Sequence, residues 1–73
     1  MSPAVPRGLS GTQIAKALVR AGFTHVSTRG SHAKYRWEER TVIVPLHHEL
    51  APGVVRSILR QADWSVEDLL GNL

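Results

Sequence analysis

The spacing of apolar residues changes twice along this chain, and these changes restrict the possible folds more than any other feature of the sequence. Apolar residues recur at helical spacing over residues 14–21, follow the strand period of two over residues 23–47, and return to helical spacing from residue 53. A chain of 73 residues has room for one domain. The pattern therefore predicts a single α+β domain over residues 10–73.

The first helical segment carries its own start and stop signals. Ser10 and Gln13 match a capping box, in which each side chain satisfies a free backbone N–H of the other residue. Gly22 predicts the end, because glycine enters the left-handed conformation without steric cost. We expect this helix over residues 11–21. Residues 1–9, which contain two prolines and a glycine, should be a flexible lead-in.

Three segments with strand-like alternation follow, over residues 23–30, 31–40 and 41–47. Short polar turns separate them, with Glu38–Glu39–Arg40 at the tip of one hairpin. Pro45 has no N–H to donate to a ladder, so it should end the third strand or lie on an edge of the sheet. We expect three antiparallel strands.

The second helical segment contains one apolar stripe, formed by Val55, Ile58, Leu59 and Ala62. Pro52 fits its first turn, where the missing N–H would have no partner. Asp63 and Trp64 should break this helix, and Ser65 should cap a short last helix. The side chains expected to dock that helix are Val66, Leu69 and Leu70. The predicted order is α-β-β-β-α(-α), with a three-stranded antiparallel sheet and the helices packed on one face.

Composition narrows the class of protein. The absence of cysteine excludes disulfides and thiolate metal sites. No stretch is apolar and long enough to span a membrane, and the first residues lack the apolar region of a secretory signal, so we expect a cytoplasmic protein. Residues 1–45 carry seven Lys or Arg against two Glu, a net charge of +5, whereas residues 46–73 carry −2. A basic half suits a polyanionic partner.

The segment SHAKYRWE, residues 31–38, alternates apolar and basic side chains. Successive side chains of a strand point to opposite faces. One face, which should meet the helices, holds Ala33, Tyr35 and Trp37. The other face, left to solvent or to a ligand, holds His32, Lys34 and Arg36. Such an alternation needs no function to explain it.

His32 adds a functional interpretation of the basic face. Histidine titrates near neutral pH, so it can take a proton from a hydroxyl and return one. Lys34 and Arg36 on the same face can hold a phosphate and stabilise the charge that develops on it. Gly30 has no side chain to block an approaching backbone, and we group Gly30 and Ser31 with the two cations as RNA or phosphate contacts. These are the parts of a metal-independent ribonuclease.

His47 and His48 raise the question of a metal site. Adjacent residues of a strand point to opposite faces, so we do not expect the two rings to share one ion, and we predict no metal. His47 would lie near His32 if the second and third strands are neighbours. We therefore keep His47 as a candidate second catalytic or RNA-contacting residue.

Four segments in order resemble the HicA toxin family, the small mRNA interferases of bacterial and archaeal toxin–antitoxin pairs. They are GTQIAKALVRAGF, RGSHAKYR, VPLHHEL and PGVVRSILRQADWSVEDLL, and the resemblance extends from Ser10 to Leu70. It implies a fold similar to the double-stranded RNA-binding domain, cleavage of mRNA without a cofactor, and neutralisation by a HicB-like antitoxin. It places the family's catalytic histidine on His32, its preceding glycine on Gly30, and the histidine often found after Val-Pro on His47.

We therefore expect the toxin of a type II toxin–antitoxin system, a metal-independent endoribonuclease that uses His32 on single-stranded mRNA and arrests translation and growth. One alternative is a non-catalytic RNA-binding module of the same fold. Such a module is expected to open its second helix with a lysine-rich cluster, which PGVVRS lacks. Another alternative is a protein-interaction subunit, which would lose His32 without consequence.

Overall fold

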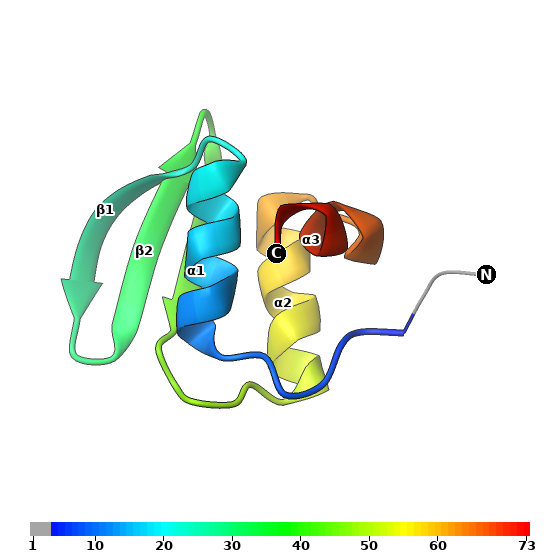
Figure 1. Cartoon of the computed structure of the whole chain (residues 1–73). Coiled ribbons are helices and arrows are strands. Elements are labelled where there is room, and N and C mark those ends of the chain that lie inside the picture. Colours follow the sequence, from blue (N-terminus) through cyan, green and yellow to red (C-terminus); the bar gives the residue numbers. More distant parts are fainter. Residues whose placement is uncertain (1–3) are drawn as a thin grey trace.

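Helices and strands follow one another in the order that the sequence predicts. The computed structural model describes residues 4–73. Its elements are α1, Gly11–Arg20; β1, Thr24–Arg29; β2, His32–Trp37; β3, Arg40–Pro45; α2, Pro52–Ala62; and α3, Val66–Asn72. The strands form one antiparallel sheet in the order β1-β2-β3, with the helices to one side of it (Figure 1). The α+β class and the three-stranded antiparallel sheet are confirmed.

Short-range polar contacts begin α1 and α3 where the sequence places these helices. Ser10 Oγ accepts a hydrogen bond from the Gln13 backbone N–H at 3.1 Å, and Gln13 Oε1 accepts one from the Ser10 N–H at 2.9 Å. Ser65 and Asp68 form the same capping box at the start of α3. Asp63, with φ of 57°, takes the left-handed conformation that ends α2. A side-chain N-cap such as Ser10 or Ser65 stabilises a helix by about 0.5–2 kcal/mol.

A single apolar core fills the space between the sheet and the helices. Its largest fully buried side chains are Ile14, Leu18, Ile58, Leu69, Val42, Val44 and Val55. Full burial of such a side chain stabilises the fold by about 1.5–3 kcal/mol. The prediction that Leu70 docks α3 is wrong, because this side chain stays 47% exposed. Successive residues of a helix face different directions, so burial of Leu69 turns its neighbour towards solvent.

Residues before α1 also contribute to the core. Residues 1–3 of the predicted lead-in lie outside the described residues. Leu9 is buried, and its carbonyl accepts a hydrogen bond from the Leu50 N–H at 2.8 Å. No helix within residues 4–73 combines the length and apolar character needed to cross a bilayer.

The two edge strands of the sheet differ in how far the helices cover them. At the β3 edge, Gln61 Oε1 from α2 accepts a hydrogen bond from the Ile43 N–H at 2.8 Å. At the other edge all six residues of β1 are exposed. The pairing of β1 with β2 shifts between His25 and Ser27, and this bulge interrupts the regularity of the free edge. The helices therefore cover the β3 side of the sheet more fully than the β1 side.

The apolar face of β2 is buried over only part of its length. Ala33 is 1% exposed and Tyr35 is 8% exposed, as the alternation predicts. Trp37 was expected on the same buried face, yet it is 38% exposed because it is the last residue of the strand. Its ring packs at 6.1 Å from the Phe23 ring, and the Arg40 guanidinium lies 5.1 Å from its centre. Trp37 thus packs at the end of the core.

Candidate active site

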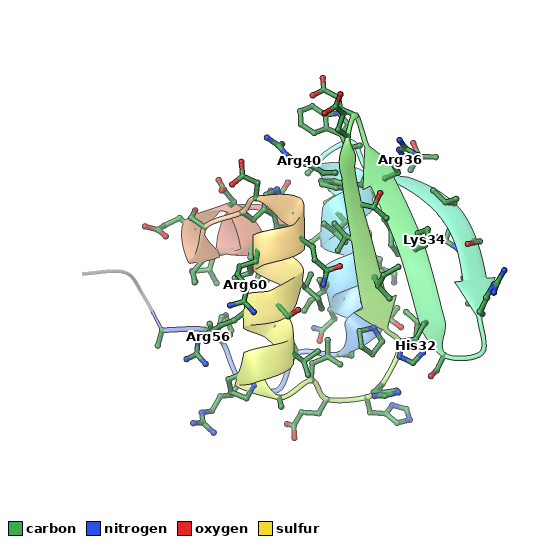
Figure 2. The ribbon with its side chains drawn as sticks, turned by 180° about the vertical axis from the view of Figure 1, so that it is seen from behind. His32, Lys34, Arg36, Arg40, Arg56 and Arg60 are labelled. Atoms are coloured by element: carbon green, nitrogen blue, oxygen red, sulfur yellow. The ribbon has the colours of Figure 1, made fainter. Side chains whose placement is uncertain are left out.

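The outward face of β2 carries the basic residues singled out from the sequence. His32, Lys34 and Arg36 are exposed and alternate with the buried Ala33 and Tyr35. Figure 2 shows the three outward residues following one another along β2. Burial of the alternate positions fixes this arrangement, because a strand cannot turn one set inwards without turning the other outwards. The structure therefore places the histidine and both cations on one accessible face.

A two-residue turn places His32 at the start of β2. Gly30 and Ser31 connect the strands, and Arg29 pairs with His32 across the turn. Gly30 has φ of +56°, a left-handed conformation that side chains rarely adopt. A Cβ atom at Gly30 would meet no atom within 4 Å. Glycine is thus needed here for backbone conformation, and the space above it remains open to a ligand.

The cations of this face have no carboxylate partners among residues 4–73. The single salt bridge of that range joins Arg40 to Asp63 at 3.2 Å. Arg36 Nε donates to the Glu38 carbonyl at 3.1 Å, which ties its guanidinium to the hairpin turn. Arg29 shares the face of its cross-strand partner His32, because directly opposed residues of paired strands lie on the same side. This surface, formed by Arg29, His32, Lys34 and Arg36, is called the basic face below.

His47 lies beside His32, as the pairing of the second and third strands predicts. The two ring centres are 6.2 Å apart, with an angle of 74° between the ring planes. His47 Nε2 lies 3.3 Å from Ser31 Oγ in the turn before β2. The Leu46 N–H donates to the Ser31 carbonyl at 2.6 Å. The β1–β2 turn and the β3–α2 connection therefore meet at these two histidines.

The placement of His47 and His48 on a strand is wrong. The last strand ends at Pro45, and both histidines lie in the connection to α2. Strand alternation therefore does not set the directions of their rings. Within the part of the chain that the structure describes, no group of three His, Cys, Asp or Glu side chains is arranged to hold a metal ion.

The start of α1 fixes the backbone that carries His47. The Gly11 N–H donates to the His47 carbonyl at 2.9 Å. A Cβ atom at Gly11 would overlap the Pro45 carbonyl oxygen, so only glycine permits this close approach. The Gly11 N–H, which has no partner within α1, is thus satisfied by the loop that carries His47.

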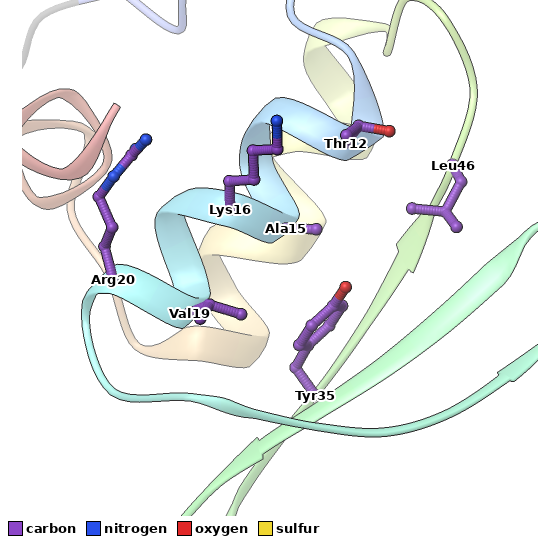
Figure 3. Close-up of a pocket in the computed structure, with 7 residues that line it drawn as sticks. All are labelled: Thr12, Ala15, Lys16, Val19, Arg20, Tyr35 and Leu46. Atoms are coloured by element: carbon purple, nitrogen blue, oxygen red, sulfur yellow. The ribbon is translucent and has the colours of Figure 1, made fainter.

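An open groove lies elsewhere, between α1 and the sheet, with a volume of about 420 Å³. Tyr35 and Leu46 line it opposite α1, and Figure 3 shows the charged ends of Lys16 and Arg20 pointing away from Tyr35. Burial raises the pKa of the Tyr35 hydroxyl above its ordinary value. The groove opens on the buried side of β2, whereas His32 lies on the opposite side. It brings together no acid–base pair.

A second group of cations lies on α2. Arg56 and Arg60 are exposed, and Figure 2 shows them on the helix side of the molecule, away from Lys34 and Arg36 on β2. No histidine lies on α2. These arginines add to the positive charge of the chain without joining the basic face.

Sequence reasoning missed two residues that shape the site. Arg29 could have been found from the hairpin, because a two-residue turn at Gly30 and Ser31 makes Arg29 the cross-strand partner of His32. Gly11 had a weaker signal. Its position after an N-cap is ordinary for a helix, and only the packing of α1 against the β3–α2 connection reveals why a side chain cannot be placed there.

Comparison with known proteins adds one finding to this geometry. A family model described as HicA toxin of bacterial toxin-antitoxin matches residues 11–64, more than half of the chain. The matched range contains the basic face, the neighbouring His47, and Gly11, whose N–H donates to the His47 carbonyl. No curated protein matches the chain.

Proposed function

The chain belongs to the HicA toxin family of bacterial toxin–antitoxin systems, and we propose that it is a metal-independent endoribonuclease that cleaves mRNA with His32 as its catalytic base. The observation that carries the proposal is an exposed histidine among three cations that lack carboxylate partners within residues 4–73. Its place of action is the cytoplasm, where mRNA is translated. Cleavage there would arrest translation and growth.

The proposed reaction uses the ribose of the RNA as its nucleophile. His32 takes the proton of a 2′-hydroxyl, and the 2′ oxygen attacks the neighbouring phosphorus. Negative charge then develops on the phosphate oxygens, where Arg29, Lys34 and Arg36 stabilise it. All the reacting groups come from the RNA and the protein, so the reaction requires neither a metal nor an organic cofactor.

The geometry of β2 favours an extended, single-stranded substrate. Side chains on one face of a strand recur about every 7 Å. His32, Lys34 and Arg36 therefore form a line along the strand, and an RNA strand lying along β2 would present successive phosphates to them. Gly30 and Ser31 stand at the beginning of this line, where the open space above Gly30 admits the RNA backbone. We assign these two turn residues to RNA contact.

Growth of a bacterial host tests the function. Expression of the chain should arrest growth, and His32→Ala should relieve the arrest, because a positioned general base contributes about 10²–10⁴ in rate. His25→Ala is the matched control, since His25 is also an exposed histidine of the sheet but bonds to Thr28 at 2.7 Å. A folded His32→Ala protein that remains equally toxic would contradict the assignment of the base.

A toxin of this family is paired with an antitoxin, and we propose that a HicB-like antitoxin covers the basic face. The exposed cations favour an acidic partner surface through charge complementarity. Hydrogen exchange of the complex should show protection over residues 30–36 relative to the free toxin. Protection restricted to residues 11–21 and 53–70 would instead mean that the antitoxin binds the helices and leaves the basic face open.

A further inference from the structure

His47 is held next to His32 by contacts from two other segments. Its Nε2 lies 3.3 Å from Ser31 Oγ, and its carbonyl accepts the Gly11 N–H at 2.9 Å. His25 bonds instead to Thr28, and His48 makes no side-chain hydrogen bond within the described residues. Of the other three histidines, His47 is therefore the one positioned to act with His32.

The cleavage reaction creates a need that His32 alone does not meet. Breaking the bond between phosphorus and the 5′ oxygen leaves an alkoxide, which requires a proton as it departs. General acids supply such protons from hydrogen-bond distance. Tyr35 lies on the buried side of β2, and Glu49 lines a different hollow together with Gly8. The imidazole whose ring packs beside that of His32 within residues 4–73 is His47, at 6.2 Å between ring centres.

We propose, on the basis of the function proposed above, that His47 is the general acid of the cleavage. As the 2′ oxygen bonds to phosphorus and His32 receives its proton, the bond from phosphorus to the 5′ oxygen breaks. The protonated ring of His47 gives a proton to that oxygen. The products are a 2′,3′-cyclic phosphate and a 5′-hydroxyl, and proton exchange with water returns both rings to their starting states.

Ser31 has a positioning role in this mechanism. A protonated imidazole carries an N–H on each nitrogen, so Ser31 Oγ accepts from Nε2 and fixes the orientation of the ring. The Nδ1–H makes no hydrogen bond to residues 4–73 and is the group that donates to the leaving oxygen. The turn that brings His32 into β2 thus also orients the acid.

An RNA with a sulfur atom in place of the 5′ oxygen at one mapped cleavage site tests the role of His47. A thiol has a pKa of about 8.5, so a thiolate leaves without being protonated. His47→Ala should slow cleavage of the ordinary RNA by about 10²–10⁴, yet cleave the sulfur-containing RNA within a few-fold of the wild-type rate. His32→Ala should be slow on both substrates.

Two further variants separate acid catalysis from structural damage. His48→Ala removes the adjacent exposed histidine and should cleave both substrates as the wild type does. Ser31→Ala removes both the bond to His47 and an assigned RNA contact, so it should slow the ordinary RNA more than the sulfur-containing RNA, and by less than His47→Ala does. Equal losses on both substrates in His47→Ala would overturn the general-acid role while leaving the ribonuclease function intact. A wild-type protein that cleaves neither RNA would overturn the proposed function itself.

Discussion

The two faces of β2 have opposite environments although their residues alternate within one strand. Ala33 and Tyr35 are buried beneath the helices, whereas His32, Lys34 and Arg36 are exposed. The inner face is explained by packing, since its side chains complete the core. The outer face makes no contribution to the core, so its side chains are free to contact a ligand.

Electrostatics sharpens this difference between the faces. Arg29 lies diagonally across the strand pair from Lys34, at positions whose backbones are roughly 7–8 Å apart. No carboxylate of residues 4–73 forms an ion pair with either side chain. The inner face therefore serves stability, whereas the outer face presents cations without carboxylate partners in that range.

Leucine placed at neighbouring positions of β2 should distinguish the faces most strongly. Ala33→Leu adds volume to a position that is 1% exposed and should lower the free energy of unfolding by about 1–3 kcal/mol. Lys34→Leu places the same side chain on the exposed face and should change it by no more than about 0.5 kcal/mol. Urea unfolding measures both. Similar losses in the two variants would mean that the outer face also supports the fold.

Most of the fold was predictable because its signals are local. The Ser10–Gln13 box is complete within four residues of sequence, and the alternation along β2 depends on a period of two that any strand imposes. The exposure of Trp37 and Leu70 was not predictable in this way. Both are apolar, and their exposure depends on where β2 ends and on which of the two adjacent leucines α3 buries.

Removal of single cations should weaken RNA binding in a graded way. In a His32→Ala background, Lys34→Ala or Arg36→Ala should each make the slope of log affinity against log salt shallower by about 0.7, the value for one lost contact to a single-stranded phosphate. Arg56→Ala, on α2, is the matched control and should leave the slope unchanged. A change for Arg56→Ala equal to that for Lys34→Ala would mean that RNA does not select the basic face.

The candidate site was only partly predictable. His32, Lys34 and Arg36 follow from strand parity, and the approach of His47 to His32 follows from the pairing of neighbouring strands. The bond between Ser31 and His47, by contrast, depends on how the β1–β2 turn meets the β3–α2 connection. Contacts between loops that are distant in sequence leave no periodic signal.

Tyr35 should produce the smallest effect, at alkaline pH. Burial raises the pKa of its hydroxyl in the folded state, so the folded state holds the proton more tightly than the unfolded chain. This contribution to stability is complete below the unfolded value of about 10 and is lost as pH rises through the folded value. The free energy of unfolding in urea should therefore fall more for the wild type than for Tyr35→Phe between pH 8 and pH 11. Parallel losses would contradict the effect of burial on this hydroxyl.

The central claim is that the outer face of β2 performs metal-independent RNA cleavage through His32, and the rate of cleavage of a defined single-stranded RNA in EDTA tests it most directly. The wild type and His25→Ala should cleave at similar rates. His32→Ala should be slower by about 10²–10⁴ while its urea midpoint stays unchanged. A strict requirement of the wild type for added metal, or a folded His32→Ala variant that cleaves at the wild-type rate, would contradict it.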